Sequence, residues 1–372
     1  MPFVALVPKN IINFALDLGT KHVGRTRQPP AHTAMTKTSS FIRHHSAILA
    51  SALIVMAAGG IAAWRCLPSS ADDMRRSTVA VEKLTWYELH HAGHAVLFFS
   101  TLTGDSAIGG LTTSAKEAQV SHLQGGCWMH RWPIIPSCRG RIVTADLSPS
   151  PSKALLGVRQ MLERAAHEAG RASMISGEIS DEIDYYLRVH GVQDEGYQPV
   201  AALVSKVSAR KAQVQATSAV ADSILHTGAR LTIVRRTAWR IHYREAEGLK
   251  PCVIGCRLLA SDAKHHLALI QTSDASTPAK AKAQWLLPWN TTNHTLLAAG
   301  LAGVGNDMGQ TDADVLITQG RRKGSEHNFP QLLASDGCPL FTPRGLFAGL
   351  IVGHEMASRA QIERILTKGG WR

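Results

Sequence analysis

A long stretch of helical periodicity in the middle of the chain constrains its fold more than any other feature. From residue 158 to 190, apolar and small residues recur at spacings of three and four, which predicts one buried helix face. The segment SPSPS at 148–152 precedes this run, and GVQDEGYQP at 191–199 separates it from a second run over 200–225. We expect an antiparallel helical hairpin over residues 152–226, with a compact bundle of three or four helices as the alternative.

Short runs typical of β-strands lie on both sides of the predicted hairpin. They are apolar or alternating and are bounded by turn residues, while residues 356–366 have the period of a closing amphipathic helix. The fold class predicted is therefore mostly β with a helical insertion. The expected strands are 94–101, 106–113 and 141–145 before the hairpin, and 231–234, 239–243, 253–259, 266–271, 295–301, 339–341 and 346–352 after it.

An apolar segment without formal charge lies near the N-terminus, from Ser46 to Trp64. Its length suits the roughly 30 Å of a bilayer's hydrocarbon core, and the Lys and Arg residues upstream are opposed by a single Asp. This bias predicts a transmembrane helix, with residues 1–45 as a basic cytoplasmic tail and the C-terminal bulk exported. Two alternatives stay open: a signal peptide that starts at Met35 and is cleaved near residues 58–63, and a buried core helix.

The exported part is expected to consist of a tether and an interrupted β domain. Residues 65–80 would form the tether, residues 81–151 the first part of the domain, and residues 227–372 its remainder. We expect an envelope protein of bacterial type whose main domain is periplasmic or extracellular. It would be anchored in the inner membrane or, in the alternative, secreted after signal cleavage.

The net charge of +12 is spread unevenly along the chain. Residues 1–66 hold 7 basic and 1 acidic residue, whereas residues 67–372 hold 33 basic and 27 acidic residues. The larger part is only mildly basic, so no dense basic face is required by the composition. Nucleic-acid binding is therefore not expected.

The spacing of cysteine and histidine residues indicates neither a metal site nor a cofactor site. Cys127 and Cys138 are near enough in sequence to pair, whereas Cys252 and Cys256 lie on an expected strand that holds them too far apart for a disulfide. The motif HHAGH at 90–94 lacks the carboxylate of a zinc-binding HExxH helix, and its glycine disfavours a helix. We expect these histidines to be a solvated or core-edge cluster.

The stretch SDGCPLFTPRGLFAGLIVG at 335–353 resembles the nucleophile loop of trypsin-like serine proteases, in which G-[DN]-S-G-G-P-[LV] precedes a hairpin. Two further matches follow in the family's order. GRIVTADL at 140–147 is similar to the histidine loop, and HLALI at 266–270 is similar to the strand that begins with the catalytic aspartate. The resemblance covers residues 94–147 and 228–366, and it implies a trypsin-like double β-barrel interrupted by the helical segment.

At the three catalytic positions the resemblance places residues that differ from the family's. Leu147 matches the histidine, His266 matches the aspartate and Asp336 matches the serine nucleophile. Leucine cannot accept a proton, and a carboxylate is a poor acyl acceptor that would oppose an oxyanion. The resemblance therefore implies a degenerate family member that lacks the catalytic triad.

Five other residues are candidates for the roles of the missing catalytic side chains. Ser335 precedes the matched nucleophile position and is the rescue candidate, while Cys338 is expected to be a small buried residue rather than a thiolate. A base would have to come from His130 or His265. Asp146 is expected to be a solvated turn residue.

Three functions remain open at the level of sequence. The first is a membrane-anchored pseudoprotease that binds peptides or envelope proteins. The second is an active serine endopeptidase whose catalytic residues are displaced in register. The third is an interaction protein in which residues 153–225 mediate homo-oligomerisation and the β domain is structural.

Overall fold

The computed structural model describes residues 68–103, 107–130, 139–147, 157–227, 230–243, 252–286, 293–301 and 315–370. By its contacts the chain divides into Met1–Ile61 and Ala62–Arg372, and all described residues belong to the second unit. The predicted tail and the apolar segment from Ser46 to Trp64 lie outside the described residues. Among the helices that are described, none combines the length and the apolar character needed to cross a bilayer.

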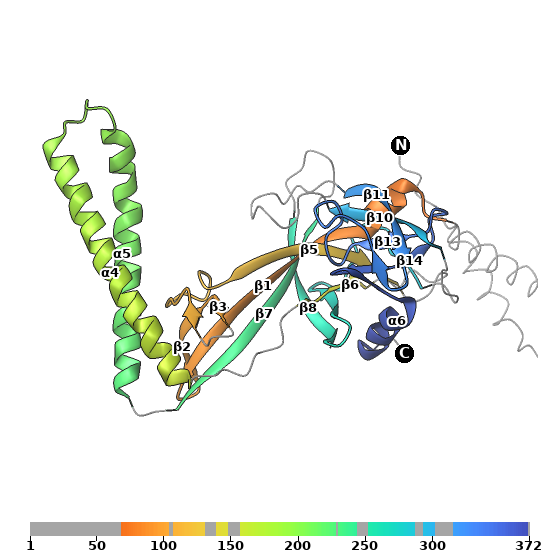
Figure 1. Cartoon of the computed structure of the whole chain (residues 1–372), viewed down its shortest axis with the longest axis horizontal. Helices are drawn as coiled ribbons and strands as arrows, with labels where there is room; N and C mark the ends of the chain where they lie inside the picture. The colour runs from red at the N-terminus through yellow and green to blue at the C-terminus, as the bar shows by residue number, and fades with distance from the viewer. Residues whose placement is uncertain are drawn as a thin grey trace, which may run out of the picture. The chain divides into compact units, whose positions relative to one another are not determined.

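Six antiparallel strands close into a first barrel, termed barrel 1. Their order around it is β1-β5-β6-β9-β8-β7, and pairing of β7 with β1 completes the ring. In Figure 1 the long strands β1 and β7 run side by side. The strands are β1 (Thr78–His91), β5 (Val120–Trp128), β6 (Arg141–Ala145), β7 (Leu231–Tyr243), β8 (Cys252–Asp262) and β9 (Leu267–Thr272).

A second closed barrel, barrel 2, follows in the C-terminal part of the chain. Its order is β10-β11-β12-β15-β14-β13, so both barrels arrange their strands as first, second, third, sixth, fifth and fourth. Two six-stranded barrels with this order confirm the predicted mostly β fold of the trypsin-like double-barrel type. The strands are β10 (Thr295–Leu301), β11 (Val315–Lys323), β12 (Glu326–His327), β13 (Pro339–Phe341), β14 (Phe347–Val352) and β15 (Glu355–Ala357).

Apolar side chains from both barrels and from helix α6 (Arg359–Lys368) share one core. Barrel 1 contributes Val143 and Leu269, barrel 2 contributes Phe341, and α6 contributes Ile365, each of them buried. Burial of this kind contributes about 25 cal/mol per Å² of apolar surface. The two barrels and the closing helix are therefore held as one packed body.

The predicted tether is wrong in its second half. Residues Ala71–Ser77 form helix α3, whose N-terminus is capped reciprocally by Ser70 and Asp73. The side chain of Met74 is buried in the core shared by the barrels, and strand β1 begins directly afterwards at Thr78. The sequence pattern does not indicate this helix, because Met74 is its only large apolar residue.

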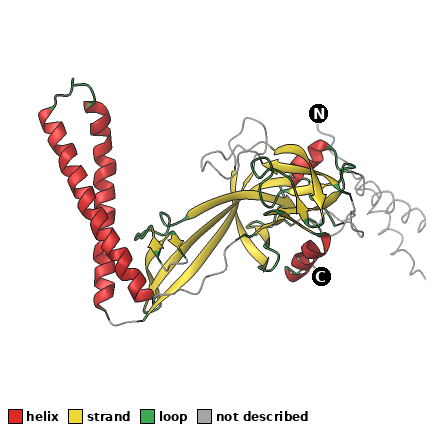
Figure 2. Ribbon diagram, viewed as in Figure 1, coloured by secondary structure: helices red, strands yellow, loops and turns green. Residues whose placement is uncertain are grey.

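Helices α4 (Val158–Val189) and α5 (Tyr197–His226) lie between β6 and β7 in the chain and run antiparallel, as Figure 2 shows. The described residues of this segment form a hairpin of two helices rather than a bundle. At its base, the hairpin packs on strand β2 (His94–Phe99), which pairs with β1, and on the short strands β3 (Thr101–Leu102) and β4 (Ile108–Gly109). Its base is thus anchored by tertiary contacts.

Candidate functional site

The first two matched catalytic positions lie at neighbouring strand ends of barrel 1. Strand β6 pairs with β9 so that Ala145 is opposite Leu267. Leu147 lies two residues after Ala145, and His266 directly precedes Leu267. The backbone N–H of Asp146 also donates a hydrogen bond to the carbonyl of His266, at 2.7 Å. The sheet pairing of β6 with β9 therefore brings the segments of Leu147 and His266 together.

The third matched position reaches the same region through strand β5. The N–H of Gly125 on β5 donates to the carbonyl of Asp336 at 2.7 Å. The Thr144 hydroxyl on β6 donates to the carbonyl of Gly125 at 2.6 Å, so one chain of bonds links the loop before β13 to the end of β6. All three matched positions therefore border this contact between the barrels, which we call the junction.

Two glycines make the close approach at the junction possible. Gly337 has φ +81°, and a Cβ built there would lie 2.0 Å from the carbonyl oxygen of Gly125. A Cβ at Gly125 would lie 2.4 Å from the sulfur of Cys338. Real side chains do not tolerate such distances, so the loop and strand β5 can meet only as bare backbone.

The side chains at the first two positions cannot act as the general base and the orienting carboxylate of a catalytic triad. Leu147 is 40% exposed, and its side chain carries only apolar atoms. His266 is exposed and adopts φ +52° at the turn between β8 and β9, a backbone conformation uncommon outside glycine. An imidazole in this place cannot act as the carboxylate that orients a catalytic histidine.

The carboxylate of Asp336 has a structural partner. Its Oδ1 accepts a hydrogen bond of 2.6 Å from the N–H of Gly353, which has φ +62° in the turn between β14 and β15. A carboxylate that caps a tight turn is fixed in place and remains an acceptor. Asp336 therefore stabilises the turn and offers no hydroxyl for attack on a carbonyl.

One imidazole that sequence reasoning missed lies near Asp336. Burial, followed by nearby His354, holds the pKa of His327 below its ordinary value, although Asp336 opposes this shift. The Nδ1 of His327 accepts a hydrogen bond from the N–H of Phe329 at 3.3 Å. His327 is therefore a neutral, internally bonded group at neutral pH, and no motif in the sequence marks it.

The rescue nucleophile Ser335 points into its own loop. The residue is only 7% exposed, and its hydroxyl lies 3.4 Å from the sulfur of Cys338. Burial raises the pKa of Cys338 to about 11, so this sulfur is a thiol at neutral pH. The prediction that Cys338 is a small buried residue is confirmed, and the contact of Ser335 is with sulfur rather than with an imidazole.

The expectation that Asp146 is a solvated turn residue is wrong. Its carboxylate forms an ion pair with Lys83 of β1, and the two side chains are only 18% and 7% exposed. The ammonium of Lys83 also lies 5.3 Å from the ring centre of Trp239. Asp146 thus neutralises a buried lysine in barrel 1, a partner 63 residues away that the sequence does not indicate.

Neither proposed base lies beside the matched nucleophile position. His130 directly follows Met129, whose N–H donates a hydrogen bond to the carbonyl of Arg141. Arg141 is the first residue of β6 and lies about 13 Å along the strand from Ala145, near which the matched positions lie. The ring of His265 lies 2.9 Å from the carboxylate of Asp262. Both histidines therefore have places in the fold that do not assemble a triad.

The remaining cysteines and histidines belong to β structure. Cys252 and Cys256 lie on β8 and are free, and burial raises the pKa of Cys256 to about 12, whereas Cys138 lies outside the described residues. The HHAGH motif forms the β1–β2 hairpin, in which Ala92 and Gly93 have φ of +51° and +85°. Within the described residues, no group of His, Cys, Asp and Glu could hold a metal ion.

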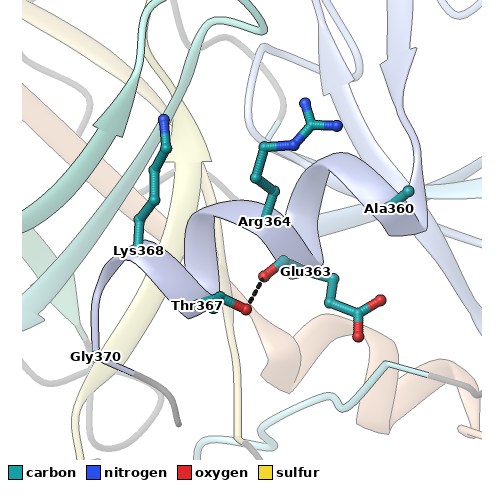
Figure 3. Close-up of a pocket in the computed structure, with 6 residues that line it drawn as sticks. All are labelled: Ala360, Glu363, Arg364, Thr367, Lys368 and Gly370. Atoms are coloured by element: carbon teal, nitrogen blue, oxygen red, sulfur yellow. Dashed lines mark hydrogen bonds between the residues drawn. The ribbon is translucent and has the colours of Figure 1, made fainter.

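A broad hollow lies along helix α6. Figure 3 shows the side chains of Arg364 and Lys368 extending from the same side of α6. The Thr367 hydroxyl donates a hydrogen bond to the carbonyl of Glu363. Its lining also includes Ala360 and Gly370 but none of the three matched catalytic positions. Its described lining comes from the exposed side of α6 and from Gly370 just after the helix, without an opposing wall from another element, so it is unlike a substrate cleft.

Comparison with known proteins finds no family and only distant similarity to solved structures. No protein family model matches the chain, and no curated protein matches it. Among solved structures, Deg5 is similar over 76% of this chain and 85% of its own, with 10% identity and a TM-score of 0.30. A serine endoprotease from Yersinia pestis is similar over 82% of this chain and 67% of its own, with 11% identity and a TM-score of 0.33. The double-barrel architecture rests on strand order rather than on these likenesses.

Proposed function

We propose that the protein is a trypsin-like pseudoprotease, which keeps the two barrels but binds polypeptides without cutting them. One observation carries this proposal. The positions that border the junction are occupied by Leu147, His266 and Asp336, none of which can take the role that acyl transfer requires there.

The physical argument concerns the charge that develops during amide hydrolysis. A nucleophile must lose its proton to a base, and the tetrahedral oxyanion must then be met by hydrogen-bond donors. Leucine cannot accept the proton, and the carboxylate of Asp336 would place negative charge beside the oxyanion. Loss of a triad member costs several powers of ten in rate, so the loss of all three leaves no triad catalysis.

The burial of the nearby nucleophiles supports the same proposal. Ser335 bonds within its loop and Cys338 is fully buried, with its pKa raised to about 11. A nucleophile must reach its substrate and must be activated by a base within hydrogen-bond distance. Neither residue meets both conditions, which disfavours the alternative of an active serine endopeptidase.

We also propose that the barrels act outside the cytoplasm, on peptides or envelope proteins, with the chain held to the membrane through the segment from Ser46 to Trp64. The support is the absence of formal charge in this segment together with the basic residues upstream of it. Secretion after signal cleavage would leave the barrels in the same compartment. The two cases differ in whether the purified mature protein begins before or after this segment.

Fluorophosphonate labelling together with casein hydrolysis tests the loss of catalysis. We expect no labelling above that of a Ser335→Ala variant, and casein that is bound in fluorescence anisotropy without being hydrolysed. Ser335→Ala is the matched control because it removes this buried hydroxyl and no other atom. Labelling and hydrolysis that both disappear in this variant would establish an active endopeptidase and refute the proposal. Failure to bind casein would refute the binding role.

A further inference from the structure

We propose that a second copy of this chain docks on one face of the α4–α5 hairpin, through an apolar strip formed by Ile175, Ile179 and Leu203. This assigns a surface and a partner that the proposed function of the barrels does not require. The argument starts from the face of the hairpin that the β structure already covers.

At its base, this face of the hairpin packs against strand β2 and its neighbours. Met161 and Ala165 of α4 and Ile224 of α5 are buried in one cluster with Phe99 of β2. The side-chain amide of Gln213 on α5 also contacts the carboxylate of Glu117. The β structure therefore covers the inner half of both helices on one side.

Helix geometry carries the same face into the outer half of the hairpin. Fourteen residues make nearly four turns, so residues 14 apart lie on the same side of a helix. Ile175 and Ile179 follow Met161 and Ala165 by this spacing, and Leu203 precedes Thr217, which is 1% exposed, by the same spacing. The strip is thus the outward continuation of a buried face.

In the outer half nothing described covers this face. Ile175 is 56% exposed, Ile179 is 44% exposed and Leu203 is 46% exposed. Between residues 169 and 180 the half-buried positions of α4 are small, whereas the large apolar side chains of Ile175 and Ile179 are exposed. These half-buried positions are Ala169, Gly170, Ala172, Ser173, Ser176, Gly177 and Ser180. Over residues 169–180, α4 therefore packs on α5 through small residues and leaves Ile175 and Ile179 exposed, as a helix does when it has a further partner. Nearer the tip, Ile183, Tyr186 and Leu187 take the half-buried positions.

Charges beside the strip specify what that partner is. Gly170 faces Ser218 across the hairpin, since a Cβ at Gly170 would lie 4.0 Å from the Ser218 hydroxyl. Because the helices are antiparallel, Glu182 on α4 is then level with Lys206 on α5, each twelve residues from that contact. In the same way Glu178 is level with Arg210.

These acids and bases are not paired with each other inside one chain. All four are exposed, and among the described residues the ion pairs of the hairpin join Arg159 to Glu163 and His190 to Asp194. One helix edge is thus acidic and the other basic at the same height. A surface of this kind complements a second copy of itself.

A two-fold axis parallel to the hairpin satisfies both the apolar and the charged features. It lays α4 of one copy on α5 of the other, so that every neighbouring pair in the resulting four-helix bundle is antiparallel. Glu182 then faces the partner's Lys206, and Glu178 faces the partner's Arg210. The outer half of the hairpin offers about 500 Å² per copy, below the roughly 800 Å² of a standard interface, so we expect micromolar affinity.

Sedimentation velocity of the full chain over about 1–100 µM tests this dimer directly. Ile179→Asp should weaken self-association by at least about tenfold, because it buries a charge in the strip. The matched control is Met174→Asp, since Met174 is 68% exposed but lines a groove on a different side of α4, with His167 and Arg171. The control should leave the association constant within about twofold of the wild type.

A charge exchange gives a second readout that a merely structural role would not produce. Glu182→Lys and Lys206→Glu should each weaken the dimer by about threefold to tenfold, and the double variant should regain most of the loss. A wild-type chain that stays monomeric up to about 100 µM would overturn the proposal. So would an Ile179→Asp chain that associates like the wild type, or a double charge variant that associates no better than the single ones.

Discussion

The two barrels share a strand order but differ in the lengths of their strands. In barrel 1, β1 and β7 have 14 and 13 residues, whereas in barrel 2 β12, β13 and β15 have only 2 or 3. The outer part of β1 pairs with β7 and also with strand β2, on which the base of the helical hairpin packs. Connectivity therefore defines the barrel, while strand length leaves room for an added element.

The barrels also differ in what they bury. The cluster centred on barrel 2 is apolar and includes Leu296, Leu340 and Ile351. Barrel 1 buries two adjacent charged residues of β1, since Glu82 is 8% exposed and Lys83 is 6% exposed. A buried charge is tolerated only with a partner, so barrel 1 depends on specific ion pairs to a degree that barrel 2 does not.

The largest expected effect breaks the buried pair of barrel 1. Lys83→Met should lower the free energy of unfolding by about 3–5 kcal/mol, because the carboxylate of Asp146 loses the ammonium that neutralises it. Urea denaturation measures this loss. Hydrogen exchange should show it first in barrel 1.

The control for this prediction removes both charges. Lys83→Met combined with Asp146→Asn should recover most of the stability, since replacing a whole buried pair is far less costly than removing one member. A double variant as unstable as the single one would show that the pair is not the cause. Faster exchange in barrel 2 than in barrel 1 would contradict the comparison itself.

A second substitution tests the junction that joins the barrels. Gly337→Ala should destabilise the protein by about 2–3 kcal/mol, because the new Cβ would lie 2.0 Å from the Gly125 carbonyl and the backbone has φ +81°. Thermal unfolding measures the change. Gly324→Ala is the matched control, with φ +66° but nothing within 4 Å of its Cβ, and it should cost only about 1 kcal/mol. Equal losses in the two variants would assign the effect to backbone strain alone.

The pH dependence of stability sharpens the contrast between the barrels. Burial tends to raise the pKa of Glu82, but hydrogen bonds from Ser121, Arg240 and His242 outweigh it and hold the pKa below its usual value. A lowered pKa contributes stability that is present above the unfolded pKa, near 4.5, and lost as the pH falls through the folded pKa. Glu82→Gln should therefore cost about 1–2 kcal/mol at pH 7 and progressively less below about pH 4.5.

Urea denaturation of the Glu82 variant between about pH 7 and pH 3 provides the measurement. The matched control is Glu326→Gln in barrel 2, whose side chain is exposed on β12 and should change stability by less than about 0.5 kcal/mol at any pH. A loss for Glu82→Gln that does not diminish on acidification would show that ionised Glu82 is not what stabilises barrel 1.

The smallest expected effect concerns the inserted hairpin. Gly177→Ala should stabilise α4 by about 0.5–1 kcal/mol, because glycine costs helix stability and a Cβ there has nothing within 4 Å. Protection of α4 amides against hydrogen exchange measures the gain, and barrel amides should not change. A loss of protection would mean that a side chain at this position meets a neighbour, as in a tighter helical pair.

Much of the secondary structure was predictable because its pattern is local. The predicted strands at 141–145, 295–301 and 339–341 coincide with β6, β10 and β13, and the helical periodicity identified α4 and α5. Two predicted strands, 231–234 and 239–243, proved to be one strand, β7. Arg236, which lies between the two predicted runs, forms an ion pair with Glu88 of β1 in the continuous strand.

Strands β1 and β5 were not predicted at all. The sequence of β1 contains Glu82, Lys83 and Glu88, which are unusual for a buried strand, and β5 contains Gly125 and Gly126. These residues become favourable only when distant segments supply ion-pair partners or require close backbone approach. The candidate site was also only partly predictable. The residues at the three matched positions could be read from the sequence. The pairing of Asp146 with Lys83 and the nearness of His327 to Asp336 could not.

The sequence by itself determined the periods of the main elements, the order of the strand runs around a helical insertion, and the chemical groups present at the matched catalytic positions. Only the tertiary structure decided that the strands close into two barrels, that Asp336 caps a turn and that Asp146 neutralises Lys83. The reason is physical. Local propensity and periodicity act within a few residues, whereas charge neutralisation and close backbone contact depend on groups far apart in the chain.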